Sequence, residues 1–288
     1  MAGATPRWAD IRAMAQLAER MGFDSVWMSD HLGFGDPADD APGAWRGAWE
    51  SWTMLAALAA ATERVQLGNY VLCTPFRNPA LLAKMAETLD EVSGGRLILG
   101  LGVGWNEIEF SSYGFPFADR FDRFEDDLRI ITSMLRTGRA THEGRFEQAR
   151  DARIEPRGPR PGGLPVMVGA AGPRLLRLTA ELADHWNGSL RSLGETRALV
   201  AAVDAACEAA GRDPSTLTRS VEVLVRTLPA TAGEPPRDHE LRGDTAAIAE
   251  AIASYADLGI DELQVQFAPN ARASVEAFEP VIEMLRAG

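Results

Sequence analysis

The sequence predicts an α/β fold, a TIM barrel of the (β/α)8 type, on three observations. Strand-like segments alternate with helix-like segments along nearly all of the 288 residues. The strand-like segments are near-continuous Val, Ile and Leu runs, which are typical of parallel sheets covered by helices. Eight helical segments favour a closed barrel, and an open doubly wound sheet remains the alternative.

Seven strands are predicted from short apolar runs bounded by turn residues. The clearest is LILGLGV at 97–103, which has no polar residue. Gly and Asn, followed by Cys-Thr-Pro, indicate a bulge near the end of the strand at 65–73. The seven predicted strands are 25–30, 65–73, 97–103, 165–169, 185–189, 221–227 and 263–267.

The helices are predicted from apolar residues spaced three and four apart. The first has Trp8, Ile11 and Met14 on one face and ends at Gly22, and prolines open the helices at 79 and 173. The eight predicted helices are 8–21, 49–61, 79–92, 121–135, 173–183, 194–210, 245–258 and 274–285.

All of these elements are expected to form one barrel domain over residues 1–288, with one strand missing. No strand-like run precedes the first helix, so either the sequence begins after that strand or the barrel closes in another way. The segment 138–164 is predicted to be an insertion in which 140–142 pairs with 145–147 as a small hairpin.

Composition and charge exclude several classes of protein. A net charge of −12 argues against a nucleic-acid partner, because phosphate contacts need a basic face. No apolar run approaches the roughly 20 residues that span a bilayer, and no signal peptide is recognised. Two cysteines without metal-like spacing favour a reducing cytoplasm.

Ser29-Asp30-His31 ends the first predicted strand and is the first candidate site. Active sites of barrels lie at the C-terminal ends of strands, and the ordinary pKa of histidine suits acid–base catalysis. Asp30 is the candidate for orienting or charging the His31 ring. The structural alternative is that His31 only caps the strand.

The run Gly100-Leu101-Gly102-Val103-Gly104-Trp105-Asn106-Glu107 is the second candidate. Its small residues predict room for a planar ring, with Trp105, Asn106 and Glu107 in the following loop; packing of the barrel is the alternative explanation for the glycines. Because no regular helix is expected after it, the run is not interpreted as a dinucleotide-binding fingerprint. Glu109 is expected to face solvent.

The turn between the fourth predicted strand and its helix is the third candidate. Gly169, Ala170, Ala171 and Gly172 precede a helix with proline at its first position, so free backbone N–H groups could hold an anion. A tight turn without a ligand is the alternative. For Gly243-Asp244-Thr245, helix capping is the better explanation.

Metal and serine-hydrolase chemistry are not supported. The four histidines, at 31, 142, 185 and 239, form no HxH or HExxH pair, so no metal is predicted. No GxSxG motif occurs.

Long stretches of the chain resemble the bacterial luciferase-like monooxygenase superfamily, and within it the users of the deazaflavin F420 rather than FMN. The resemblance is carried by AERMGFDSVWMSDHL, WESWTMLAALAAATERVQLGNYV, RNPALLAKMAETLDEVSGGRLILGLGVGWNEIEFSSYG, RFDRFEDDLRII and PVMVGAAGPRLLRLTAELADHWN. It implies a TIM barrel with the flavin-like ring across its mouth, and a homodimer in which helices around 52–61 and 81–89 meet.

The resemblance also implies roles for individual residues. A bulge with a non-prolyl cis peptide, at about Tyr70–Val71, backs the ring. His31 is an acid–base candidate with Asp30 beside it, and the 169–172 turn holds the cofactor phosphate. A glutamate that donates a proton in some F420 users aligns here with Trp105, so Glu107 is a substitute candidate.

The expected function is F420-dependent hydride transfer to or from a small organic substrate, with His31 moving a proton. Aromatic residues of the long loops predict an apolar part of the substrate, and packing or a dimer interface is their alternative role; they are Phe34, Trp45, Trp49, Trp105 and Phe110. The alternative functions are an FMN-dependent monooxygenase and a cofactor-binding homologue without turnover.

Overall fold

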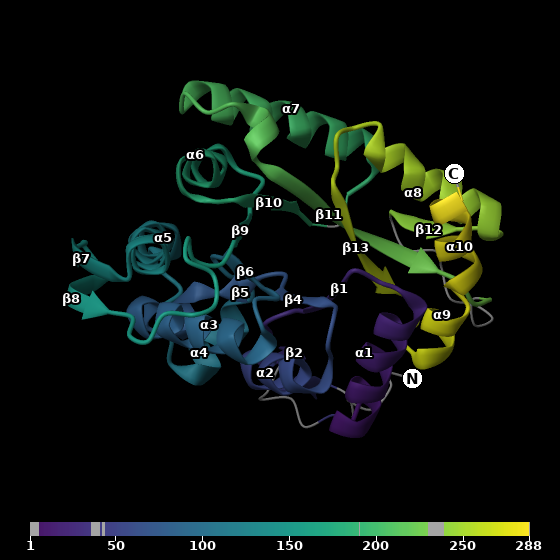
Figure 1. Cartoon of the computed structure of the whole chain (residues 1–288), viewed down its shortest axis with the longest axis horizontal. Coiled ribbons are helices and arrows are strands. Elements are labelled where there is room, and N and C mark those ends of the chain that lie inside the picture. Colours follow the sequence, from purple (N-terminus) through teal and green to yellow (C-terminus); the bar gives the residue numbers. More distant parts are fainter. Residues whose placement is uncertain (1–5, 36–40, 42–43, 190, 230–238, 288) are drawn as a thin grey trace. The chain divides into compact units, whose positions relative to one another are not determined.

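The computed structural model describes residues 6–35, 41, 44–189, 191–229 and 239–287 (Figure 1). The chain divides into two compact units, which are described in turn. The first unit comprises Met1–Glu19 and Phe23–Met167, and the second comprises Arg20–Gly22 and Val168–Gly288.

Parallel strands form the centre of the first unit. Strand β1 (Ser25–Met28) pairs with β4 (Gln66–Asn69), and both β4 and the short β5 (Leu72–Cys73) pair with β6 (Leu97–Gly102). Every residue of β6 is buried, as expected for a parallel strand that is covered on both faces. The sequence-predicted apolar run at 97–103 is therefore confirmed as a core strand.

Four longer helices lie wholly or mainly in the described part of this unit. Helix α1 (Trp8–Met21) has the predicted bounds and comes first in the order of elements along the described residues. Helix α2 (Ser51–Ala61) contacts β4, and α3 (Pro79–Ser93) contacts both β6 and α5 (Arg120–Thr137). Asn78 and Pro79 begin α3, and Gly94 ends it in the left-handed conformation at φ 70°.

The predicted strand at 65–73 is interrupted. It becomes β4 and β5, separated by Tyr70–Val71, whose peptide bond is cis, as the resemblance predicted. A short 3-10 helix, η1 (Thr74–Phe76), follows β5.

The glycines of β6 accommodate this interruption. A Cβ at Gly100 would lie 1.8 Å from the carbonyl oxygen of Asn69, and a Cβ at Gly102 would lie 2.4 Å from Val71 Cγ2. The protein's own atoms fill the space next to both glycines. The packing explanation for these glycines is therefore favoured over room for a ring.

Three elements of the first unit were not predicted or were placed differently. The segment after β1 contains a hairpin, β2 (Gly33–Gly35) with β3 (Trp45–Gly47). The segment after β6 contains helix α4 (Glu107–Tyr113), so the expectation of a loop there was wrong. The predicted hairpin is confirmed, but β7 (Arg139–Glu143) pairs with β8 (Gln148–Arg153), and residues 145–147 lie in the connection.

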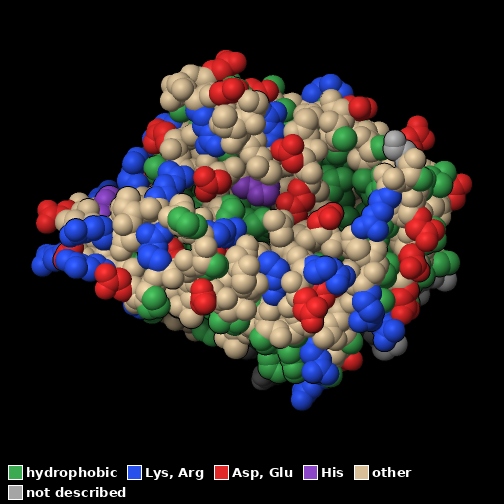
Figure 2. Space-filling model, viewed as in Figure 1, with side chains coloured by type: hydrophobic (Ala, Val, Ile, Leu, Met, Phe, Trp, Pro, Cys, Tyr) green, Lys and Arg blue, Asp and Glu red, His purple; other side chains and the backbone are tan. Residues whose placement is uncertain are grey.

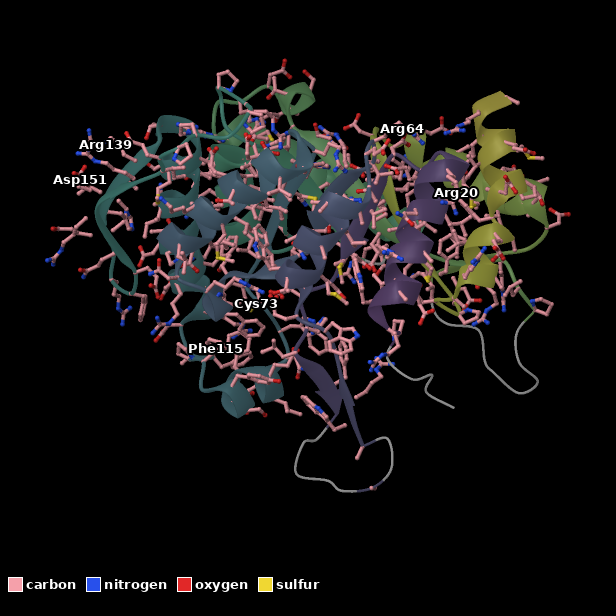
Figure 3. All side chains as sticks on the ribbon, turned by 60° about the horizontal axis from the view of Figure 1, so that its bottom comes forward. Arg20, Arg64, Cys73, Phe115, Arg139 and Asp151 are labelled. Atoms are coloured by element: carbon pink, nitrogen blue, oxygen red, sulfur yellow. The ribbon has the colours of Figure 1, made fainter. Side chains whose placement is uncertain are left out.

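The β7–β8 hairpin carries exposed arginines. In Figure 3, Arg139 and Asp151 point toward each other at its edge, where they form an ion pair. In Figure 2, arginine side chains gather at this end of the face in view, among acidic ones. The exposed arginines of the hairpin are Arg139, Arg145, Arg150 and Arg153.

The second unit also has a parallel core. Strand β9 (Val166–Gly169) contains the boundary between the units, and β10 (His185–Gly188) pairs with β11 (Thr218–Arg226). Strand β11 pairs in parallel with both β12 (Glu240–Arg242) and β13 (Glu262–Phe267). Strand β12 was not predicted, and nine residues of the loop before it, 230–238, lie outside the described residues.

Helices follow the strands of this unit as the sequence predicted. They are α6 (Pro173–Leu182), α7 (Leu193–Ala209), the short η2 (Pro214–Thr216) and α8 (Thr245–Ala256). The predicted last helix is two helices, α9 (Arg272–Glu276) and α10 (Glu279–Ala287). Pro280 explains the break, because proline is tolerated only in a first helical turn.

Within the described ranges, no helix is long and apolar enough to cross a membrane. The same ranges contain no cluster of three or more His, Cys, Asp or Glu side chains that could hold a metal ion.

Candidate functional site

His31 follows the C-terminal end of β1, and its side chain is 18% exposed. Its Nδ1 atom lies 3.0 Å from Oε2 of Glu109. The ring is close to two aromatic side chains, with its centroid 4.4 Å from that of Phe34 and 5.6 Å from that of Trp105. His31 is thus a half-buried imidazole that is held on one nitrogen and flanked by apolar rings.

Glu109, on α4, is the partner of His31, and its side chain is only 3% exposed. Its Oε1 atom accepts hydrogen bonds from Leu32 N at 2.5 Å and from Gly33 N at 3.1 Å. The expectation that Glu109 faces solvent was therefore wrong. A carboxylate on a buried helix face requires donors, and the residues next to His31 supply them.

Asn106, immediately before α4, contacts the same segment. Its Nδ2 donates to the carbonyl oxygen of Gly33 at 3.3 Å, and the residue is buried. Asn106 and Glu109 are three residues apart, so a helical turn brings them to the same side. Recognition of a helix at 107–113 would have placed Glu109 on the same side as Asn106, but would not have identified His31 as its partner.

Asp30 is the centre of a buried clamp. Arg77 contacts both of its carboxylate oxygens, at 2.6 and 3.0 Å. Ser51 Oγ donates to Oδ1 at 2.7 Å, and the backbone N–H of Cys73 donates to Oδ2 at 3.0 Å; Cys73 is labelled in Figure 3. These contacts connect the end of β1, the end of β5 and the start of α2. Asp30 was the candidate for orienting the His31 ring, but the carboxylate that contacts this ring is that of Glu109.

Glu50 extends the clamp to helix α2. It caps α2 by accepting from Trp52 N and Thr53 N, and it also pairs with Arg77 at 2.5 Å. Burial alone would raise the pKa of Glu50, but hydrogen bonds from Thr53 and Arg77 lower it below its ordinary value. Arg77 was not predicted as a site residue, because nothing in the local pattern around it indicates a partner more than 40 residues earlier.

The remaining candidates near β6 take different positions. Glu107 is exposed at the start of α4, and the structure brings Glu109 rather than Glu107 to His31. Trp105 is 68% exposed. Of the other loop aromatics, Trp45 fills the space beside Gly33, and Phe110 is buried against Phe76 and Phe117.

In the second unit, the predicted anion-binding turn precedes α6. Gly172 is the N-cap residue, no side chain caps the helix, and Pro173 begins it. A Cβ at Gly172 would meet no atom within 4 Å, so the space beside it is open. Asp244 caps α8 by accepting from Ala247 N at 2.9 Å, which confirms capping as the role of that motif.

These features are compatible with a flavin-like cofactor. The Oδ1 atom of buried Asn69, the residue before Tyr70–Val71, has no hydrogen-bond partner among the described residues and is suited to accept one bond. The N-terminus of α6, a ten-residue helix without a side-chain cap, offers backbone N–H groups and a favourable dipole for a phosphate. The described residues therefore fit the chemistry of such a group in each unit separately.

Comparisons with known proteins agree with this interpretation. A family model described as luciferase-like monooxygenase matches residues 1–232. The F420-dependent glucose-6-phosphate dehydrogenase of Amycolatopsis mediterranei (strain U-32) is 34% identical over 241 residues, which are 80% of this chain and 66% of that protein. The 5,10-methylenetetrahydromethanopterin reductase of Archaeoglobus fulgidus is 29% identical over 178 residues, which are 62% of this chain and 48% of that protein.

A solved structure extends the comparison to the fold. It is an F420-dependent secondary alcohol dehydrogenase in complex with an F420-acetone adduct, with a TM-score of 0.80 and 19% identity. The similarity covers 98% of this chain and 96% of that one, and shows that they share a fold. In sequence, by contrast, the chain spans less than two thirds of the length of the two relatives named above.

Proposed function

The chain belongs to the luciferase-like monooxygenase family, and from this premise we propose that it is an F420-dependent oxidoreductase acting on a small organic molecule, with His31 as its proton-transfer residue. The observation that carries the proposal is the geometry of His31. It is half-buried, follows a parallel strand, is held by a carboxylate on Nδ1, and is flanked by Phe34 and Trp105.

The choice of F420 is supported by the relatives. The curated proteins and the solved structure named above include two whose names state F420 dependence. When bound, the deazaflavin would supply the hydride acceptor or donor. The chain would bind and orient it, exclude water and move the accompanying proton.

Particular residues would hold the cofactor. By resemblance, Tyr70 and Val71 would back the ring. Trp105 and Asn106, predicted from the sequence pattern after β6, would lie near it, whereas the space that the pattern predicted beside Gly102 is filled by Val71. Backbone N–H groups of the turn before α6 would bind the phosphate. The residues of that turn are Gly169, Ala170, Ala171 and Gly172.

His31 would hold or move a proton at Nε2, because Nδ1 is already engaged by Glu109. An aliphatic alcohol or carbonyl is a suitable partner, since Phe34 and Trp105 present apolar surface close to the His31 ring. The clamp of Asp30, Arg77 and Glu50 would keep the strand ends fixed beneath this group.

The family resemblance also supports a proposal on barrel closure and on the oligomeric state. We propose that the parallel strands close into a TIM barrel and that the chain forms a homodimer through α2 and α3. Helix α3 leaves Leu81 and Val92 exposed. Light scattering should give a mass twice that of the 31.1 kDa chain, and a monomer at micromolar concentration would contradict the dimer.

Fluorescence titration tests the cofactor. Micromolar protein should quench F420 fluorescence with saturation, whereas FMN should give no saturable change. If only FMN binds, the monooxygenase alternative is correct. If F420 binds but a broad set of alcohols and carbonyls gives no turnover, the homologue without turnover is correct.

A further inference from the structure

We infer that Glu109 is a positioning residue that fixes the tautomer of His31, so that Nδ1 carries the proton and Nε2 presents its lone pair. The inference concerns the loop formed by His31, Leu32 and Gly33, which α4 holds through Glu109 and Asn106. The effect that it predicts on enzyme activity rests on the proposed function, but the tautomer that it predicts for His31 does not.

Backbone donors determine the protonation of one oxygen of the Glu109 carboxylate. Oε1 of Glu109 faces two backbone N–H groups, those of Leu32 and Gly33. Backbone N–H groups can only donate, so Oε1 must be an unprotonated oxygen. Such contacts favour the ionised carboxylate, which is a pure acceptor.

The other carboxylate oxygen of Glu109, Oε2, lies 3.0 Å from His31 Nδ1. Facing a carboxylate oxygen, Nδ1 must be the donor, and in the neutral imidazole Nε2 is then unprotonated. A protonated carboxyl that donates from Oε2 would give the opposite tautomer, and the test below distinguishes the two.

A glutamine at position 109 would keep the loop contacts but reverse the hydrogen bond to His31. In Glu109→Gln, the amide oxygen can still accept from Leu32 N and Gly33 N, while the amide NH2 can only donate to Nδ1. The loop contacts are thus retained, but Nδ1 must become an acceptor and the proton must move to Nε2. If Glu109 only packed against the loop and did not set the tautomer of His31, Glu109→Gln would leave the proton on the same ring nitrogen.

The experiment is nitrogen NMR of the imidazoles. Long-range 15N–1H spectra of the full chain at about pH 8.5, where free imidazole is neutral, report which ring nitrogen carries hydrogen. The chain has only four histidines, and His31 is assigned by the loss of its signals in His31→Asn. We expect hydrogen on Nδ1 in the native chain and on Nε2 in Glu109→Gln.

A matched control uses another glutamate. Glu91→Gln changes an exposed residue of α3 and should leave the His31 signals unchanged. Hydrogen on Nε2 in the native chain, or averaging between both tautomers, would overturn the inference. The native measurement does not use Glu109→Gln, so the inference stays testable even if that variant folds poorly.

The activity arm uses F420 and whichever alcohol or carbonyl the native chain turns over. Glu109→Gln should lower kcat by about 10²-fold or more, the usual contribution of a positioned acid–base group. Its affinity for F420 should stay within about threefold, because the fold and loop contacts remain. Native kcat in Glu109→Gln would refute positioning, whereas absence of F420 turnover in the native chain would refute the proposed function and leave the tautomer result standing.

Discussion

Asp127 is a buried carboxyl of α5 for which the proposed function gives no role. Burial raises its pKa to about 7, and the nearby hydroxyl of Thr74 opposes the rise only in part. The acidic neighbours Glu147 and Asp126 raise it further. The folded chain therefore keeps Asp127 protonated at pH values where the unfolded chain does not.

This difference gives a signed pH dependence. Between about pH 4 and pH 7 the folded state holds one proton more than the unfolded state, so stability falls as pH rises through that window. Asp127→Asn should remove that slope. Urea unfolding at about pH 8 should show the variant more stable by roughly 2–4 kcal/mol, with the difference vanishing near pH 4. Parallel pH profiles for the two proteins would contradict the assignment.

Arg77 and Asp30 offer a second prediction for single residues. Arg77→Met leaves the Asp30 carboxylate buried with, among the described residues, the Ser51 hydroxyl and the Cys73 N–H as its remaining hydrogen-bond donors. Loss of one partner from a buried ion pair costs about 3–5 kcal/mol, which urea unfolding would measure. The control is Arg139→Met, which removes an exposed arginine from the ion pair with Asp151 and should change stability little. Equal effects of the two variants would show that the clamp is not a buried pair.

Side-chain partners were the least predictable features at this scale. His31 was recognised because it ends a strand, which is a local signal. The partners of His31 and Asp30 are Glu109 and Arg77, 78 and 47 residues later in the chain. A single sequence contains no signal for such pairs, so Asp30 was expected to serve the ring that Glu109 in fact contacts.

At the scale of elements, the turn before α6 gives the sharpest test. Gly172 has φ −86° and ψ 154°, and a side chain there would enter open space. Gly172→Asp should therefore be tolerated, since aspartate is a favoured N-cap residue. Its charge would repel a phosphate bound at the helix N-terminus, so we expect F420 affinity to fall about tenfold or more, an effect of about 1.4 kcal/mol.

The control for this variant is Gly162→Asp, at another exposed glycine whose Cβ would meet no neighbour. Thermal unfolding of both variants should match that of the native chain or exceed it. If Gly172→Asp binds F420 as tightly as Gly162→Asp does, the phosphate does not bind at this turn.

Elements with a clear apolar pattern were predicted well, whereas α4 and the β2–β3 hairpin were not predicted. The periodic helix at 8–21 and the buried strand at 97–103 were placed within one residue, because each pattern repeats over several positions. Helix α4 has only seven residues and follows Gly104-Trp105-Asn106, which resembles a loop. The β2–β3 hairpin has strands of three residues, too short for an alternating pattern to be recognised.

At the scale of the whole molecule, the account depends on one ligand reaching two parts of the chain. The His31 site belongs to the first unit, and the turn at 169–172 belongs to the second. The family resemblance, rather than any local pattern, is what connects these two segments in one proposal. Neither periodicity nor spacing could have done so, since each describes only neighbouring residues.

The most direct test is a crystal structure of the chain with bound F420. We predict the deazaflavin ring against Tyr70–Val71, with its phosphate on the backbone N–H groups of residues 169–172 and His31 Nε2 facing the reactive side of the ring. A cofactor bound to only one of these segments, or a ring remote from His31, would contradict the account.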